Sequence, residues 1–162
     1  MKKIILAGFG YLGKFIEQQA DFNEKKVLYK LSRNPGKHRN GFGNHVEVDF
    51  DKEKFDITEI VGESTIIYMT PPNKDRDGDP RLENFLNNIK NSNLERIVYI
   101  STSGVYGDCG GLSVTEDAEL KPLTDRAKKR VIAEKMVMKH SAVCNTNYVI
   151  LRVPGIYGLG RL

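Results

Sequence analysis

Short apolar runs alternate along this chain with longer amphipathic segments. Six runs have the length of β-strands, and they span residues 3–7, 26–31, 46–48, 64–70, 97–100 and 148–153. Apolar residues at helical spacing follow the fourth run at positions 82, 85, 86 and 89, and further helices are expected after residue 13, around 55–61 and after 122. Strands that alternate with helices return to the same edge of a sheet. The pattern therefore predicts one α/β domain over residues 1–162, a doubly wound parallel sheet with helices on both faces.

The first apolar run breaks into glycines at positions 8, 10 and 13, a spacing typical of a dinucleotide-binding loop. In such a loop Gly8 permits the tight turn off the strand, Gly10 lets the backbone approach a pyrophosphate, and Gly13 lets the helix pack against the strand. The anion lies at the helix N-terminus, where free N–H groups and the helix dipole favour it. The alternative is a glycine turn in an ordinary strand–helix unit. The residues expected to bind the cofactor here are Gly8, Phe9, Gly10, Tyr11, Leu12 and Gly13.

The end of the second run bears on the choice of cofactor. An acid about 20 residues after the glycines would hold a ribose 2′-hydroxyl, whereas an arginine accommodates a 2′-phosphate. This chain has Ser32 and Arg33 at that point and no acid, so NADP is favoured over NAD. A solvated loop arginine is the alternative. Lys37, His38 and Arg39 follow, either as additional positive charge or as a solvated turn.

Composition and charge argue against nucleic-acid binding, a metal site and a membrane span. Among 162 residues, 25 Lys and Arg face 21 Asp and Glu, and the net charge of +4 is scattered, so nucleic-acid binding is not supported. Two cysteines, Cys109 and Cys144, have no pattern of a disulfide framework or a zinc site, and we expect no metal. We also expect no membrane span and a cytoplasmic location, because no apolar run approaches 18 residues and the N-terminus does not have the layout of a signal peptide.

Motifs in the second half of the chain resemble a known family. The fifth run ends in the hydroxyl-rich stretch 101–103 and continues into Val105-Tyr106-Gly107, an acidic turn follows at 116–117, and the last run closes with residues 151–158. Together with the glycine loop these motifs resemble the extended short-chain dehydrogenase/reductase family, also called NAD-dependent epimerase/dehydratases. The resemblance implies a Rossmann-type domain that binds NAD(P).

The resemblance also implies roles for particular residues. Asp49 would meet the adenine amino group, and Thr70 and Pro71 would line the ribose side. Thr102, next to Ser101, would occupy the place of the catalytic Ser or Thr, and residues 152–155, which include Pro154, would lie near the nicotinamide end.

Two departures from the family pattern limit what the resemblance implies for catalysis. Position 7 is Ala where the family usually has a further Gly. The register anchored on Glu134 puts Arg126 and Arg130 where the family has a Tyr and a Lys. Arginine stays protonated, so it cannot act as the general base that the tyrosine provides.

Candidates for the missing chemistry are hydroxyl groups and the arginines themselves. Thr102 and Tyr106 are the candidate catalytic residues, with a hydrogen-bonded strand end and a packed aromatic as the alternatives. Arg126 and Arg130 share a helix face one turn apart and are expected to bind an anion, either the cofactor or a phosphorylated or carboxylate substrate. A solvated helix face is the alternative.

The sequence thus predicts an NAD(P)-binding protein of the epimerase/dehydratase type. It would act as an atypical oxidoreductase or epimerase on a small carbonyl, alcohol or nucleotide-sugar substrate. The alternative is a non-catalytic NADP(H)-binding module that senses redox state or regulates a partner. We expect the substrate-binding part that follows in the family to be absent from this chain, and the resemblance also allows a homodimer through residues 126–140.

Overall fold

The computed structural model describes residues 2–19, 26–34 and 41–161. These residues form six strands and four α-helices, and one 3₁₀ helix, η2, follows the fifth strand. In chain order the elements are β1 (Lys2–Ala7), α1 (Tyr11–Gln19), β2 (Lys26–Ser32), β3 (Asn44–Glu47), α2 (Thr58–Val61), β4 (Ser64–Tyr68), α3 (Pro80–Ile89), β5 (Arg96–Thr102), η2 (Ser103–Tyr106), α4 (Asp125–Cys144) and β6 (Asn147–Val153).

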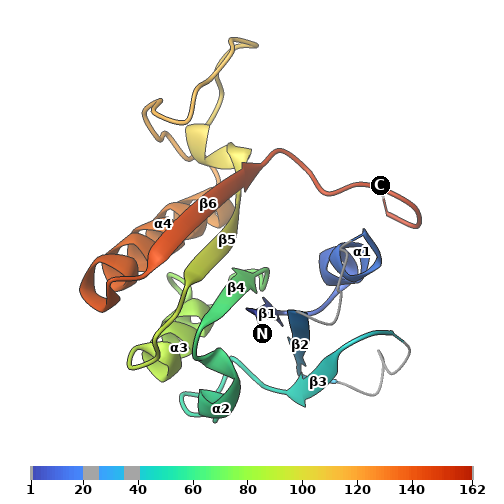
Figure 1. Cartoon of the computed structure of the whole chain (residues 1–162). Coiled ribbons are helices and arrows are strands. Elements are labelled where there is room, and N and C mark those ends of the chain that lie inside the picture. Colours follow the sequence, from blue (N-terminus) through green and yellow to red (C-terminus); the bar gives the residue numbers. More distant parts are fainter. Residues whose placement is uncertain (1, 20–25, 35–40, 162) are drawn as a thin grey trace.

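All neighbouring strands pair in parallel, and their spatial order is β3-β2-β1-β4-β5-β6 (Figure 1). Their order reverses between β1 and β4, where successive connections cross to opposite sides of the sheet. In open parallel sheets this switch point opens a crevice at the carboxyl ends of the strands. The Rossmann-type sheet predicted from the apolar runs is confirmed. The helix expected over 55–61 is shorter, because Thr58 is its first residue.

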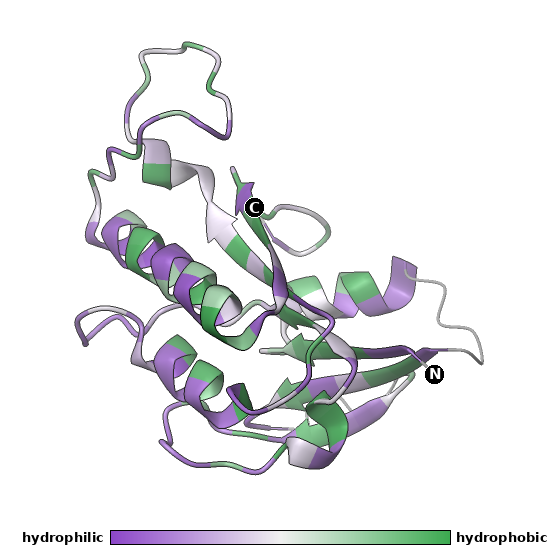
Figure 2. Ribbon diagram, turned by 60° about the vertical axis from the view of Figure 1, so that its left-hand side comes forward, coloured by the Kyte–Doolittle hydropathy of each residue, from purple (hydrophilic) through white to green (hydrophobic). Residues whose placement is uncertain are grey.

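Helices lie on both faces of the sheet. The larger core joins the sheet to α2, α3 and α4, and the smaller core packs Ile16 of α1 against Leu6 and Leu28 on the other face. Alternation along β1 explains the division, since Ile5 belongs to the first core and Leu6 to the second. Figure 2 shows hydrophobic colour along the strands, both colours in bands along the helices, and much hydrophilic colour in the loops.

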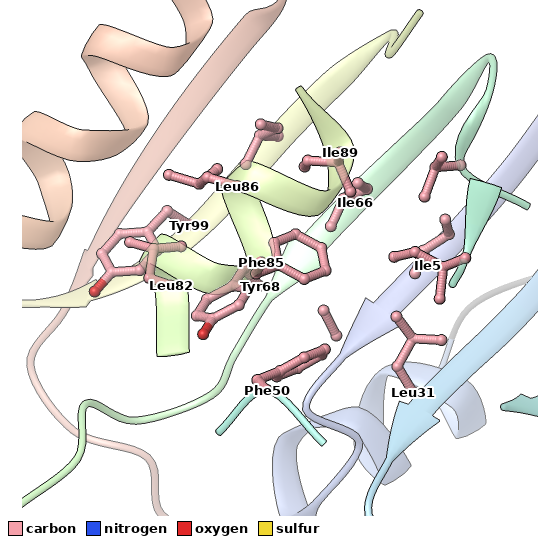
Figure 3. Close-up of a cluster of buried hydrophobic side chains, with 14 of the residues drawn as sticks. Ile5, Leu31, Phe50, Ile66, Tyr68, Leu82, Phe85, Leu86, Ile89 and Tyr99 are labelled. Atoms are coloured by element: carbon pink, nitrogen blue, oxygen red, sulfur yellow. The ribbon is translucent and has the colours of Figure 1, made fainter. Parts of the chain in front are cut away.

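Aromatic side chains fill the larger core next to the carboxyl edge. Phe85 of α3 packs between Phe50 and Tyr68, with ring centroids 5.2 and 5.1 Å away, and Tyr68 stacks on Tyr99 at 6.1 Å (Figure 3). Both tyrosine rings are buried, and their hydroxyl groups lie on the same side of the cluster. The aromatic core therefore has two phenolic hydroxyl groups along one side.

Helix α4 buries part of the face that its sequence predicts. The sequence places Ala127, Val131, Glu134 and Met138 against the sheet; Ala127 and Glu134 are buried there, but Met138 is 44% exposed. The whole buried face carries Ala127, Arg130, Ala133, Glu134, Val137 and Ser141. Arg130 and Glu134 occupy core positions because each finds a partner on the sheet, and their charge hides the helical periodicity.

Candidate functional site

Two cavities lie along the carboxyl edge, on either side of the switch point. The larger, of about 490 Å³, is lined by the glycine loop, the ends of β4, β5 and β6 and the start of α4; we call it the Arg126 cavity. The smaller, of about 210 Å³, is lined by the glycine loop and the ends of β2 and β3; we call it the Arg33 cavity. Gly8 and Pro71 line both, so the two cavities meet at the loop between β1 and α1.

The glycine loop is held by the end of β2. The amides of Gly8 and Phe9 both donate to the Leu31 carbonyl, at 3.1 and 2.9 Å. Gly8 has a φ of +88°, and a side chain added there would overlap Thr70. The first intrahelical bond of α1 runs from the Lys14 amide to the Gly10 carbonyl at 3.1 Å, so the amides of residues 11–13 precede it and point along the helix axis toward the crevice.

The other two glycines differ in what surrounds them. A methyl group added at Gly10 would meet only the Gly8 carbonyl oxygen, at 3.9 Å, and Gly10 lines the Arg126 cavity. The same methyl group at Gly13 would lie 2.7 Å from the Phe9 ring. Gly13 was expected to let the helix approach the strand, but the nearest atoms belong to the loop residue Phe9, which folds back under the helix.

Charges in the Arg33 cavity are paired. Arg81 donates to both oxygens of Asp51, at 2.8 and 2.7 Å, and the Arg33 guanidinium lies 3.5 Å from the same carboxylate. The hydrogen bond from Arg81 lowers the pKa of Asp51, and the positive charges of Arg81 and Arg33 act in the same direction. Asp49 accepts a hydrogen bond from the Asp51 amide at 3.1 Å. The buried hydroxyl oxygen of Ser32 has no hydrogen-bond partner within the described part of the chain, so a polar ligand would satisfy it.

Arginines dominate the Arg126 cavity. Arg130 is 6% exposed, donates to the Tyr99 hydroxyl at 2.7 Å and lies 5.4 Å from that ring's centroid. Burial raises the pKa of Tyr99 to about 12, so its phenol stays protonated at neutral pH. Arg161 lies over the Tyr11 ring at 5.1 Å. Arg126 is exposed in the first turn of α4.

A buried network supports the wall of the Arg126 cavity. Glu134 is 2% exposed and accepts a short hydrogen bond from Ser101, while Arg152 donates to both Glu134 oxygens at distances between 2.9 and 3.3 Å. Arg152 also donates to the Tyr106 hydroxyl at 2.8 Å, and its own pKa is raised by the hydrogen bond with Glu134. The network joins β5, α4, β6 and η2.

Most sequence-predicted residues line one of the two cavities. The Arg126 cavity has Gly8, Gly10, Tyr11, Leu12, Pro71, Ser101, Thr102, Arg126, Arg130 and Pro154. The Arg33 cavity has Gly8, Phe9, Ser32, Arg33, Asp49, Thr70 and Pro71. Gly13 and Tyr106 line neither, and Tyr106 is instead bound by Arg152. Lys37, His38 and Arg39 lie outside the described residues.

Sequence reasoning missed Asp51, Arg81 and Arg161. Arg81 directly follows Pro80, the first residue of α3, and Asp79 caps that helix by accepting from the Leu82 amide at 3.2 Å. Helices that follow the strands of a parallel sheet begin at its carboxyl edge, so a charged residue in a first helical turn is a candidate site residue. That signal identifies Arg81 but not Arg161, which lies beyond the last strand.

Within residues 2–19, 26–34 and 41–161, no group of three or more His, Cys, Asp or Glu residues gathers to hold a metal ion. None of the helices in these ranges is both long and apolar enough to span a membrane.

The arrangement of glycine loop, paired cavities and switch point is that of a dinucleotide-binding sheet, and comparison with known proteins agrees. Residues 82–161 match the model of the NAD dependent epimerase/dehydratase family. The family resemblance expected from the sequence is confirmed. A search of curated protein sequences finds no match.

Solved structures with the same fold include members of this class. UDP-glucuronic acid 4-epimerase from Bacillus cereus, solved with NAD, has a TM-score of 0.76 at 19% identity; the alignment covers 98% of this chain and 57% of that one. UDP-N-acetylglucosamine 4-epimerase from the same organism has a TM-score of 0.75 at 17% identity, with 98% and 55% covered. A functionally unknown conserved protein from Silicibacter pomeroyi is 26% identical with a TM-score of 0.74, again with 98% and 55% covered. The present chain thus spans a little over half the length of these structures.

Proposed function

We propose that this chain binds a dinucleotide, NAD(P), along the carboxyl edge of its sheet and forms the cofactor-binding part of an epimerase/dehydratase-type oxidoreductase. The observation that carries the proposal is the junction of two cavities at the glycine loop, since a dinucleotide is two nucleotides joined at a pyrophosphate. The first-turn amides of α1 and the open space at Gly10 suit that pyrophosphate.

The adenosine end would occupy the Arg33 cavity. Asp49 and Thr70 supply acceptors there, and the unpartnered Ser32 hydroxyl supplies a further hydrogen bond. Arg81 holds Asp51 with two short hydrogen bonds, whereas Arg33 contacts it only at 3.5 Å and is 61% exposed. The Arg33 guanidinium is therefore only weakly paired and is accessible to a phosphate on the ligand, which supports NADP over NAD. The NAD-bound neighbours use the other cofactor, so both must be tested.

The nicotinamide end would lie in the Arg126 cavity, where the cofactor would supply the capacity to donate or accept a hydride. Thr102 has its oxygen 3.3 Å from the Gly104 amide, which donates to it, so the hydroxyl hydrogen is available to a substrate oxygen. Arg130 is fixed by Tyr99 and would hold the cofactor's ribose or a substrate oxygen rather than transfer a proton.

Calorimetric titration with NADPH and with NADH tests the proposal, using Gly10→Ala against Gly62→Ala. Neither glycine has a positive φ, and an added methyl group has ordinary or open surroundings at both. Both variants should therefore have the same free energy of unfolding as the original chain. Gly10→Ala should lose at least about tenfold in cofactor affinity, because its methyl group occupies the path of the pyrophosphate. Equal affinity in the two variants, or no binding of either nucleotide to the original chain, would overturn the proposal.

A second candidate is the non-catalytic NADP(H)-binding module. One observation favours it: the described side chains that line the Arg126 cavity include hydroxyls and arginines but no His, Asp, Glu or Lys. Neither a hydroxyl group nor a guanidinium group exchanges a proton readily near neutral pH. Oxidation of NADPH in the presence of small aldehydes and ketones distinguishes the two, since a sensor binds NADPH without consuming it.

The substrate and the oligomeric state are further predictions. The neighbours' names include nucleotide sugars, and such a substrate is one class to test alongside small carbonyl compounds. A homodimer through α4 is likewise a prediction, to be measured by the solution mass of the chain.

A further inference from the structure

The Arg126 cavity carries an excess of positive charge that the Arg33 cavity does not. Three arginines, at positions 126, 130 and 161, line the Arg126 cavity, and no described Asp or Glu does. The Arg33 cavity has two arginines and two aspartates, Asp49 and Asp51. The difference is three positive charges on one side of the glycine loop against none on the other.

Two of the three arginines have identifiable tasks. Arg161 stacks on Tyr11, the first residue of α1, which places it beside the amides proposed to hold the pyrophosphate. Arg130 is buried, bound to Tyr99, and close enough to the buried Asp79 for its charge to favour the ionised carboxylate. Arg161 is thus placed to offset negative charge on the pyrophosphate, while Arg130 is held by Tyr99 and faces the charge of Asp79.

Arg126 has no such task within the described part of the chain. It is exposed, and no described residue forms an ion pair with it or accepts a hydrogen bond from it. Its neighbours on α4 are engaged elsewhere: Lys128 lies 3.6 Å from Asp125, and Lys129 donates to the carbonyls of Asn73 and Lys74, both at 3.0 Å. Lys128 and Lys129 also lie outside the Arg126 cavity. A solvated helix face accounts for the lysines but not for an arginine turned into the cavity.

The position of Arg126 is next to the candidate reacting group. A methyl group added at Gly104 would lie 3.6 Å from the Thr102 hydroxyl oxygen and 3.9 Å from the Ala127 side chain, so the end of β5 and the first turn of α4 are in close proximity. Arg126 precedes Ala127 in that turn. Its planar fork of donors matches a carboxylate or a phosphate, and such bidentate pairs are among the strongest hydrogen bonds in proteins.

We propose that Arg126 anchors an anionic group of the substrate, a carboxylate or a phosphate on the same carbon skeleton as the reacting carbonyl or alcohol. This inference rests on the proposed function, since it assigns the substrate class of the same site. The substrate would then be held at two points, with its reacting oxygen at Thr102 and its anion at Arg126. The family's tyrosine position would serve recognition in this chain rather than proton transfer.

A two-step calorimetric titration tests the inference. NADPH is added first to the original chain and to Arg126→Ala, Arg126→Lys and Lys128→Ala; Lys128 is the matched control, an exposed cation on the same helix outside the cavity. Malonate, and separately inorganic phosphate, is then titrated into each NADPH-loaded protein. The relative affinities of malonate and phosphate identify which anion the site prefers.

We expect all four proteins to bind NADPH within about threefold of one another. Arg126→Ala should weaken the preferred anion at least about tenfold, Arg126→Lys should fall between because it keeps the charge without the fork, and Lys128→Ala should match the original chain. Absence of anion binding to the loaded original chain, or equal losses in Arg126→Ala and Lys128→Ala, would overturn the inference.

Failure of the proposed function would appear separately, as absence of NADPH binding to the original chain. The anion titrations are then made on the free proteins. An anion signal that depends on Arg126 would still support the anion site, and a signal that does not depend on it would overturn it.

Discussion

The Arg33 cavity and the Arg126 cavity share the glycine loop yet are built in different ways. Around Arg33 the charges are paired at the surface, with Asp51 between two arginines. Around Arg126 the supporting charges are buried, in the network of Ser101, Glu134 and Arg152, while the arginine that faces the cavity is unpaired. The first arrangement suits the adenosine end of the proposed cofactor. The second suits a substrate, because changing one unpaired side chain alters recognition without disturbing the fold.

Removing the buried carboxylate should affect the Arg126 cavity most strongly. Glu134→Ala leaves the Arg152 guanidinium without its main partner and the buried Ser101 hydroxyl without an acceptor. We expect the free energy of unfolding in urea to fall by about 4 kcal/mol, since breaking a buried ion pair strands the remaining charge. The control Glu119→Ala removes an exposed carboxylate paired with Lys121 and should cost less than about 0.5 kcal/mol. Similar losses in both variants would show that the buried network is not what supports this wall.

Gly8→Ala tests the element that both cavities share. A side chain at this positive φ is strained and overlaps Thr70, so we expect about 3 kcal/mol of lost unfolding free energy. Gly62→Ala, in open surroundings, should change stability by less than about 0.5 kcal/mol. A fully stable Gly8→Ala protein would mean that the loop between β1 and α1 tolerates another conformation.

Arg33→Ala tests whether the Arg33 cavity distinguishes NADPH from NADH. If Arg33 meets a 2′-phosphate, this variant should bind NADPH about thirtyfold more weakly, or about 2 kcal/mol, while NADH affinity changes less than about threefold. Lys52→Ala, which removes an exposed cation near Asp51 but outside the Arg33 cavity, is the matched control. Equal losses for both nucleotides would remove the case for NADP preference.

Two aspartates should respond to pH in opposite directions. Hydrogen bonding to Arg81 lowers the pKa of Asp51 below 3.8, so its ionised form stabilises the fold at all pH values above 3.8. Burial raises the pKa of Asp79 above 3.8, so folding costs free energy once the pH exceeds that value and the unfolded chain ionises first. At pH 7 we expect Asp51→Asn to be less stable by about 1 kcal/mol and Asp79→Asn to be more stable by about 1 kcal/mol, because Asn also caps a helix well.

The pH range of each effect provides the check. Urea unfolding between pH 4 and 8 should show a constant offset for Asp51→Asn. For Asp79→Asn the offset should be near zero at pH 4 and grow until the pH passes the raised native pKa. An Asp79→Asn protein that is less stable at pH 7 would show that the buried carboxylate has a partner whose loss outweighs its desolvation.

The fold and the glycine loop were predictable because their signals are local. Apolar runs and the spacing of Gly8, Gly10 and Gly13 lie within a few residues of one another, and parallel connections then dictate the order of the strands. The register anchored on Glu134 also predicted that Arg126 and Arg130 share a helix face, and both line the Arg126 cavity.

What the sequence could not provide was the pairing of charges across the fold. Asp51 and Arg81 are 30 residues apart, and Arg152 reaches Glu134 over 18 and Tyr106 over 46. The hydrophobic periodicity of a sequence does not predict such long-range contacts. They are also why Arg130 is buried on α4 while Met138 is exposed, and why Tyr106, a candidate catalytic residue from its motif, lies on Arg152 instead of in a cavity.

The most direct test of the central claim is a crystal structure of the chain grown with NADPH. We expect one continuous ligand across the glycine loop, with its pyrophosphate at the amides of residues 11–13, its adenosine beside Arg33 and its nicotinamide beside Thr102. A nucleotide bound at any other surface, or with its two ends exchanged between the cavities, would contradict it.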